Sequence, residues 1–278
     1  MNAAIEHRCR AGEELTAAEI DELASADVLS LGMLADEVRR ARVGDSVTYV
    51  RDAETRLTAP SATLAETVAV IRHARASAAG VVGFSLADII DRAWGPLDGT
   101  LRQLKAAGLS AIAEAPVDAI GDITAALQAA RDAGLDVLCL SLRKPWTGSR
   151  TDYLLKVRSI VQQFPSIHTV APLPRQQSIA VPTTGYDDVR AVALARLALP
   201  AVRNIQVDWS QYGPKLAQVA LTFGANDLDR VSQNDDASLG RRRTSVEDVR
   251  RNVAAAGFTA VERSFDSPPG EARPLAQD

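Results

Sequence analysis

Hydrophobic positions along this 278-residue chain change their spacing near residue 45. Before that point apolar residues recur at helical intervals, and Thr16 followed by Glu19 has the pattern of a capping box, which starts a helix. After it, short apolar runs typical of strands alternate with helical runs of about 12 to 18 residues. The pattern therefore predicts a helical extension over residues 1–45 and a β/α domain over residues 46–266.

The alternation of strand and helix in the second part predicts a parallel sheet. Strands are expected at residues 47–50, 80–86, 109–113, 137–142, 167–172, 205–209, 228–231 and 259–263. Helices are expected to begin near residues 62, 86, 120, 151, 186, 214 and 245. Roughly eight strands suit a TIM-like β/α barrel, here partial or shortened, and a doubly wound open sheet is the alternative. The Pro- and Gly-rich residues 267–278 are expected to form a disordered tail.

Composition and charge exclude several classes of protein. The net charge is −4 and no basic segment is interleaved with aromatics, so nucleic acid is not an expected partner. No apolar stretch approaches the roughly 18 to 20 residues that span a bilayer, and the first residues lack the apolar core of a secretory signal. Cys9 and Cys139 are too few for a disulfide framework, and Cys139, between two leucines, is expected to be inert core. These features predict a cytoplasmic protein with reduced thiols.

Polar residues at the carboxyl ends of the predicted strands are the candidate ligand-binding residues, because barrel active sites lie there. Gln206 and Asp208 alternate with apolar neighbours, so they share one face of a strand. If that face is the barrel interior, both side chains need either a ligand or polar neighbours. The full set is Arg51, Asp52, Ser85, Glu114, Arg143, Arg175, Gln176, Gln206, Asp208, Trp209 and Asn234.

Three of these residues, Asp208, Glu114 and Arg175, are the candidate catalytic groups. The Asp208 carboxylate can serve as a general base or a cation ligand, or it can pair with Arg175 or Lys215. The three histidines are scattered along the chain and predict no metal site. Trp146 follows a predicted strand, where it either stacks on a flat ligand or shields the rim of the barrel.

Several segments resemble one enzyme family. They are AGEELTAAEIDELASADVLSLGMLADEVRRARVGDSVTYV, LRQLKAAGLSAIAEA, VAPLPRQQSIAVPTTGYDDVRAVALARLAL and NIQVDWSQYGPKLAQVALTFGANDL, which together cover well over half the chain. They are similar to the radical S-adenosylmethionine enzymes of the futalosine route to menaquinone, aminofutalosine synthase and cyclic dehypoxanthine futalosine synthase. The deazaflavin FO synthases are close cousins of that family. The resemblance implies a β/α barrel with a helical leader.

The departures from this family concern its cofactors. The family carries Cys-x-x-x-Cys-x-x-Cys after its first strand, where three thiolates hold a [4Fe–4S] cluster and the open iron binds S-adenosylmethionine. Residues 51–58 of this chain contain no cysteine, and one β/α unit is shortened or lost before residue 83. The cofactor-contacting end of the fourth strand is Ala-Glu-Ala-Pro over residues 113–116, and an acidic element is replaced over residues 229–233. We therefore expect no iron–sulfur cluster, no S-adenosylmethionine and no radical chemistry.

Two functions are consistent with such a chain. The first is a pseudoenzyme that binds a small molecule or a menaquinone-pathway enzyme as an accessory or scaffold protein. The second is a cofactor-independent enzyme that acts on a futalosine-like or other small polar substrate, with Asp208, Glu114 and Arg175 as the working groups. We favour the first, because the sequence holds no recognisable pair of nucleophile and base.

Overall fold

The computed structural model describes residues 1–51, 56–78, 80–176, 183–232 and 246–264. The predicted tail, the expected start of a helix at residue 245, and the candidates Asp52 and Asn234 lie outside these ranges. No helix in the described part of the chain is both long and apolar enough to cross a membrane.

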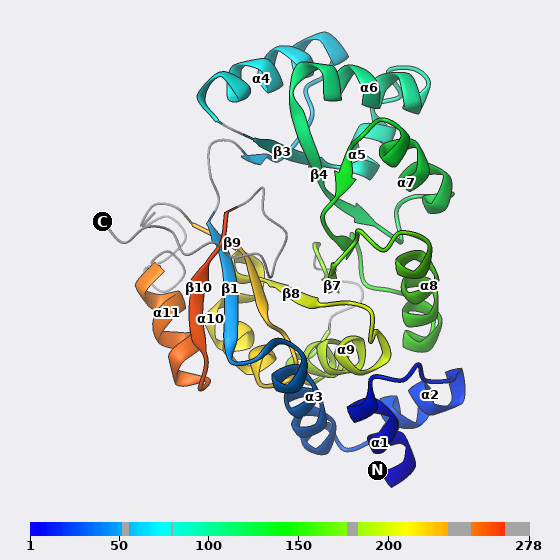
Figure 1. The fold of residues 1–278 in the computed structure, drawn as a ribbon, viewed down its shortest axis with the longest axis vertical. Helices are drawn as coiled ribbons and strands as arrows, with labels where there is room; N and C mark the ends of the chain where they lie inside the picture. Colours follow the sequence, from blue (N-terminus) through cyan, green and yellow to red (C-terminus); the bar gives the residue numbers. More distant parts are fainter. Residues whose placement is uncertain (52–55, 79, 177–182, 233–245, 265–278) are drawn as a thin grey trace.

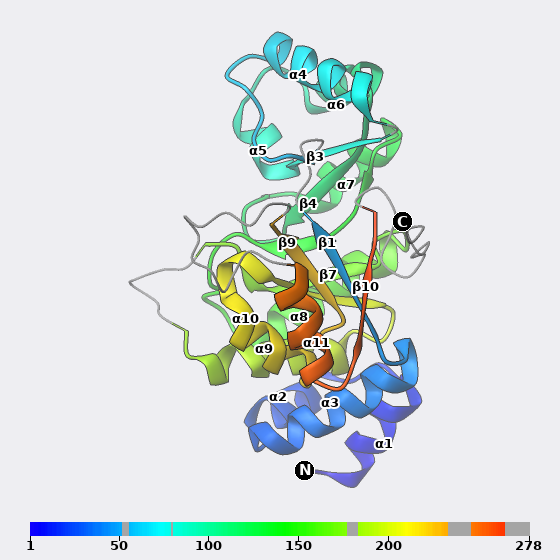
Figure 2. The same cartoon turned by 90° about the vertical axis from the view of Figure 1, so that its left-hand side faces the viewer.

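Three helices precede the first strand and lie together at one end of the molecule (Figures 1 and 2). They are α1 (Ala3–Ala11), α2 (Ala17–Ser25) and α3 (Val28–Val43). The predicted capping box is present: the Thr16 hydroxyl accepts from the Glu19 amide, and the Glu19 carboxylate accepts from the Thr16 amide. Helix α3 packs along α9, so the helical extension is joined to the sheet domain by buried contacts.

Short, mostly buried strands build one sheet, and every described pairing in it is parallel. The strands are β1 (Ser46–Arg51), β2 (Arg56–Leu57), β3 (Val81–Ser85), β4 (Leu109–Pro116), β5 (Asp136–Val137), β6 (Leu140–Leu142), β7 (Thr169–Pro174), β8 (Asn204–Asp208), β9 (Asp227–Val231) and β10 (Thr259–Glu262). Their order is β10-β1-β9-β8-β7-β6-β4-β3-β2, with β5 beside β4. The fully buried β3, β7 and β8 are typical of a parallel sheet covered on both faces.

The sheet curls into a partial barrel, which confirms the predicted fold class (Figure 1). Strand β1 lies between β9 and β10, and β2 pairs with β3 at the far edge. Among the described residues no strand pairing joins the two edges, β10 and β2. The described part of the barrel is therefore open between β10 and β2.

Helices cover the outer face of this sheet (Figures 1 and 2). They are α4 (Leu64–Ser77), α5 (Leu86–Asp91), α6 (Leu97–Ala107), α7 (Ile123–Asp132), α8 (Arg150–Gln163), α9 (Gly185–Ala198), α10 (Trp209–Leu221) and α11 (Val246–Ala255). Most begin at a Ser, Thr or Asp whose side chain accepts from a backbone amide of the first turn, as N-caps do.

Three local expectations needed correction. The single helix expected from residue 86 is two helices, α5 and α6, because Ala93 adopts a φ of 50° and Gly95-Pro96 interrupts the hydrogen bonding. The strand expected at residues 137–142 is divided into β5 and β6. Trp209, expected to end a strand, is instead the first residue of α10 and is 1% exposed in the hydrophobic core. Gly213, at φ 74°, separates this first turn from the helix that starts at Pro214 as expected.

Candidate functional site

The carboxyl end of β8 directs two polar side chains into the curled sheet, as their alternation predicted. Gln206 and Asp208 are 4% and 2% exposed, whereas their neighbours Ile205 and Val207 belong to the hydrophobic core. Asp208 also caps α10, because its Oδ1 accepts from the Gln211 amide at 3.0 Å. Both side chains therefore face the interior, and both find protein partners there.

Arg175, which follows β7, gathers the carboxylates of three strands around one guanidinium. Its Nε lies 2.8 Å from Glu114 Oε2, and its Nη1 lies 3.5 Å from Asp208 Oδ2. Its Nη2 donates to Gln206 Oε1 at 3.0 Å and lies 3.5 Å from Asp229 Oδ2. The three predicted catalytic groups thus converge, and the predicted alternative in which Asp208 pairs with Arg175 is confirmed.

Two further arginines complete this arrangement from the edges of the sheet. Arg56 on β2 binds Asp229 on β9 with two hydrogen bonds of 2.7 and 2.9 Å. Arg263, just after β10, binds Asp227 with two of 2.9 Å. Bidentate pairs of this kind are strong and directional. The Arg56 pair joins β2 to β9 across the opening of the barrel, where no backbone pairing does so.

We call this set the interior cluster; it consists of Arg56, Glu114, Arg175, Gln206, Asp208, Asp227, Asp229 and Arg263. Burial alone would raise the pKa of the Asp229 carboxyl, but Arg56 and Arg175 outweigh it and hold that pKa well below its usual range. Burial alone would lower the pKa of Arg175, but Glu114 and Asp229 outweigh it and raise that pKa. Both groups stay ionised around neutral pH, whereas a general acid or base works best when its pKa is near the working pH.

A small cavity lies beside the interior cluster. Its volume is about 30 Å³, and it touches Arg56, Cys139, Gln206 and Asp229. Since one water occupies about 30 Å³ of liquid, the cavity has room for a water and not for a metabolite.

Other predicted site residues lie elsewhere. Arg143 forms ion pairs with Asp88 and Asp91 of α5, at 2.5 and 2.9 Å. Gln176 is exposed and follows β7. Its backbone N–H donates to the Arg143 carbonyl at 2.9 Å. Arg51 pairs with Glu262 on β10. These residues stabilise the rim and do not enter the interior cluster.

Ser85 lies beside Glu114 in the β3–β4 register and is 8% exposed. Its hydroxyl has no hydrogen-bond partner among the described residues.

The interior cluster also contains residues that the sequence analysis missed. Asp227 and Asp229 alternate with Leu228 in the same way that Gln206 alternates with Val207, and this period of two is a signal that could have found them.

The described residues contain no group of three or more metal-ligating side chains. The thiols also do not fit an iron–sulfur cluster, which requires three cysteines at one place. The whole chain has two: Cys9 is buried on α1 among the N-terminal helices, and burial raises the pKa of the Cys139 thiol to about 12. At the end of β4, where the family contacts S-adenosylmethionine, the Glu114 carboxylate is already bound to Arg175. The residues present do not match that cofactor set.

Comparison with solved structures shows the class of fold. The chain superposes on methylornithine synthase (PylB) with a TM-score of 0.69 and 14% identity, covering 92% of this chain and 97% of that one. It superposes on HydG, a maturase of the [FeFe]-hydrogenase, with a TM-score of 0.66 and 11% identity. That superposition covers 93% of this chain and 74% of HydG. At such low identity these likenesses show a shared partial-barrel fold and nothing about activity.

Sequence comparison gives a more specific match for the C-terminal part of the chain. Residues 159–267 match the family described as the CofH/MqnC C-terminal region. A relative from Archaeoglobus fulgidus, 5-amino-6-(D-ribitylamino)uracil–L-tyrosine 4-hydroxyphenyl transferase, is 33% identical over 126 residues, which are 41% of this chain and 37% of that protein. The enzyme of the same name from Methanosphaerula palustris is 41% identical over 81 residues, 29% of this chain and 22% of that protein. The C-terminal part thus matches this family description, and the matches span 37% and 22% of the length of the two relatives.

Proposed function

We propose that this chain is a cluster-less relative of the menaquinone-pathway radical S-adenosylmethionine enzymes, and that it binds a small molecule or a pathway enzyme without radical chemistry. In this role it is an accessory or scaffold protein, and it works in the cytoplasm. The partial barrel is retained because its strands and helices carry the hydrophobic core, which does not depend on the cofactors.

The observation that carries this proposal is the interior cluster. Each of its carboxylates is paired with an arginine of the same chain, and the cavity left beside them is about 30 Å³. Sites for small molecules and cofactors usually measure about 300 to 1,000 Å³. The carboxyl end of the sheet, where β/α barrels place their active sites, therefore holds ion pairs in its interior.

The pathway assignment rests on the resemblance of the chain to the futalosine enzymes. The curated relatives bear a different name, which refers to 5-amino-6-(D-ribitylamino)uracil and L-tyrosine. A ligand screen should therefore include compounds from both sources. If the chain binds only 5-amino-6-(D-ribitylamino)uracil or L-tyrosine, the accessory role belongs to deazaflavin synthesis and not to the menaquinone pathway.

A second candidate function, a cofactor-independent enzyme, is favoured by the convergence of Asp208, Glu114 and Arg175. A convergent set of titratable groups is one sign of an active site. The pairing of both carboxylates with Arg175 counts against it, because each is already held by a guanidinium group of the same chain.

The first test is reconstitution of the purified chain with iron and sulfide under anaerobic conditions, followed by iron and sulfide analysis and calorimetry with S-adenosylmethionine. A relative that carries the three cysteines is treated in parallel. We expect no stoichiometric iron in this chain and no heat of binding. About four irons per chain would overturn the proposal.

The second test is a thermal-shift screen of the full chain against futalosine-pathway nucleosides, 5-amino-6-(D-ribitylamino)uracil and L-tyrosine. A ligand at 100 times its dissociation constant adds about 2.7 kcal/mol to the free energy of unfolding, which raises the melting temperature measurably. Turnover of any of these compounds by the chain alone, detected by mass spectrometry, would instead support the second candidate function.

A further inference from the structure

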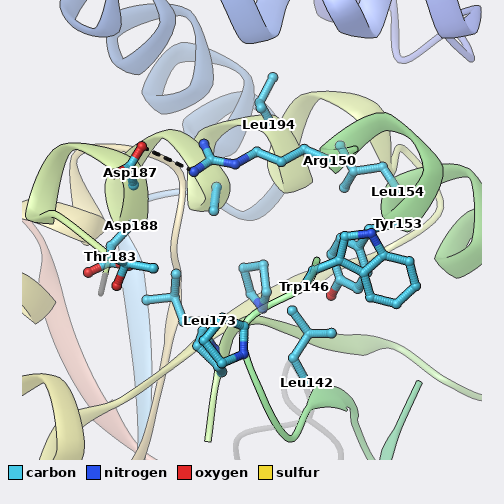
Figure 3. Close-up of a pocket in the computed structure, with 14 residues that line it drawn as sticks. Leu142, Trp146, Arg150, Tyr153, Leu154, Leu173, Thr183, Asp187, Asp188 and Leu194 are labelled. Atoms are coloured by element: carbon cyan, nitrogen blue, oxygen red, sulfur yellow. Dashed lines mark hydrogen bonds and ion pairs between the residues drawn. The ribbon is translucent and has the colours of Figure 1, made fainter. Parts of the chain in front are cut away.

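A second and larger cavity lies at the carboxyl ends of β6 and β7, where helices α8 and α9 flank the sheet (Figure 3). We call it the α8–α9 pocket. Its volume is about 300 Å³, and its lining includes Trp146, Tyr153, Leu173, Asp188 and Leu194. Counting about 30 Å³ for each water-sized group, it holds a molecule of roughly ten non-hydrogen atoms.

One side of the α8–α9 pocket is aromatic and aliphatic. Trp146 and Tyr153 lie together, with ring centroids 5.5 Å apart and planes tilted by 50°. Leu142 and Leu173 continue this surface toward the sheet (Figure 3). Tyr153 is only 5% exposed, and its buried hydroxyl has no hydrogen-bond partner among the described residues. A buried polar group of this kind normally has a partner, and an atom of a bound ligand would supply one.

The opposite side of the pocket carries an excess of negative charge. Arg150 pairs with Asp187 at 3.3 Å, and Figure 3 shows this pair across the top of the pocket. Asp188 is 7% exposed, and its carboxylate accepts a hydrogen bond from the Thr183 side chain. In the described part of the chain no cation forms an ion pair with Asp188. A buried carboxylate without a cationic partner is costly, and a bound cation removes that cost.

The structural role of the two neighbouring aspartates differs. Asp187 completes the capping box of α9, because its carboxylate accepts from the Thr184 amide and hydroxyl at 3.2 and 2.8 Å. The Asp188 carboxylate takes no part in that cap and lies in the wall of the pocket. Helix capping therefore explains Asp187, whereas the Asp188 carboxylate is held by the hydrogen bond from the Thr183 side chain.

We propose that the α8–α9 pocket binds a small apolar organic cation, with an ammonium group at Asp188 and an aromatic or aliphatic body between Trp146, Leu173 and Leu194. Aromatic rings add to this preference, because they attract cations to their faces. The proposal concerns a site apart from the interior cluster, and it does not depend on whether the chain performs radical chemistry.

The test compares three probes of one shape on the full chain by isothermal titration calorimetry: 2-phenylethylammonium, the neutral 2-phenylethanol and the anionic 3-phenylpropanoate. We expect the ammonium probe to bind at least about tenfold more tightly than the alcohol, the effect of one charge-assisted hydrogen bond. Asp188→Asn should abolish this preference while the alcohol still binds. Asp152→Asn, the same change at an exposed position of α8, should leave it intact.

A second variant guards against loss through misfolding. Ala191→Leu adds volume to the pocket without changing its charges, and it should weaken both the ammonium and the alcohol while circular dichroism stays unchanged. Equal affinity for all three probes, tighter binding of the anion, or no binding of the ammonium at millimolar concentration would overturn the proposal. So would an Asp188→Asn variant that keeps the full preference for the ammonium.

Discussion

The interior cluster and the α8–α9 pocket lie at the same end of the sheet, only a few residues apart along β7. Inside the curled sheet every carboxylate of the cluster has an arginine, and about 30 Å³ of space remains. Between the helices about 300 Å³ is open, and in the described part of the chain the buried carboxylate of Asp188 forms no ion pair. The first region holds three arginines and four carboxylates, a formal charge of −1, and each of those carboxylates has an arginine partner. The second region is open, and one of its carboxylates has no such partner among the described residues.

This difference is the reason that we propose the α8–α9 pocket, and not the interior cluster, as the ligand-binding region. A buried network in which each carboxylate has an arginine partner holds strands together, and breaking it is costly. A pocket with an unpaired carboxylate reduces stability until a ligand arrives, as binding sites often do. Our proposal therefore places ligand binding between the helices and not inside the curled sheet.

The largest expected effect comes from removing the centre of the interior cluster. Arg175→Met leaves Glu114 buried without its cation and leaves Asp208 with only the partly exposed Arg230, 3.5 Å away, so we expect a loss of about 3–5 kcal/mol in the free energy of unfolding. Urea titration followed by circular dichroism measures this change. Arg175→Lys is the matched control: it keeps the charge but cannot reach several partners at once, and should lose less. A loss below about 1 kcal/mol for Arg175→Met would mean that the cluster contributes little.

The next effect is a dependence of stability on pH that originates in Asp229. The pKa of this carboxyl is lower in the folded chain than in the unfolded one, where it is about 3.9. Its contribution is therefore complete above the unfolded pKa and is lost as the pH falls below it. Asp229→Asn should reduce stability at pH 7 and flatten its decline between about pH 5 and 2, measured by urea unfolding at each pH. Parallel curves for the two proteins would contradict this.

Asp188 should behave in the opposite way. Burial raises the pKa of its carboxyl, so the charged form disfavours the folded state and stability is lost as the pH rises through that pKa. We expect Asp188→Asn to leave stability at pH 7 unchanged or to raise it by up to about 1 kcal/mol. Differential scanning calorimetry can measure the shift. A loss above about 2 kcal/mol would show that Asp188 is part of the structural framework.

The smallest effect is expected at an ion pair on the surface. Arg102 lies 3.6 Å from Asp98 on α6, and the two side chains are 63% and 55% exposed. Arg102→Met should change the free energy of unfolding by less than about 0.5 kcal/mol, because water and salt screen the pair. This variant, measured by the same urea titration, sets the scale for the interior substitutions. A larger loss here would remove the contrast between paired charges inside and outside the barrel.

Much of the fold follows from local patterns in the sequence. The period of two along β8 placed Gln206 and Asp208 on one buried face, and the structure confirms it. Gly213 and Pro214 marked the start of the main part of α10. The pattern failed at Trp209, whose apolar ring extended the strand in the sequence but packs in the core from the first turn of α10. Periodicity records which residues are buried, and it does not record where a strand becomes a helix.

The candidate site was predictable only in part. Glu114, Arg175 and Asp208 were found because they follow predicted strands, and the structure brings them together. Arg56 was missed, because it stands on a strand of two residues and its partner Asp229 is 173 positions away. Such a pair has no local signal, since its distance in space is set by the order of strands in the sheet.

By itself, the sequence determined an alternating β/α chain, a partial parallel barrel and a thiol count too small for a three-cysteine cluster. These are local properties: hydrophobic spacing, helix caps and residue identity. The tertiary structure alone decided that β1 lies between β9 and β10, that arginines from distant strands pair with the interior carboxylates, and that open volume remains between α8 and α9. Those outcomes depend on how apolar faces far apart in the chain are buried against one another, and burial is a property of the whole fold.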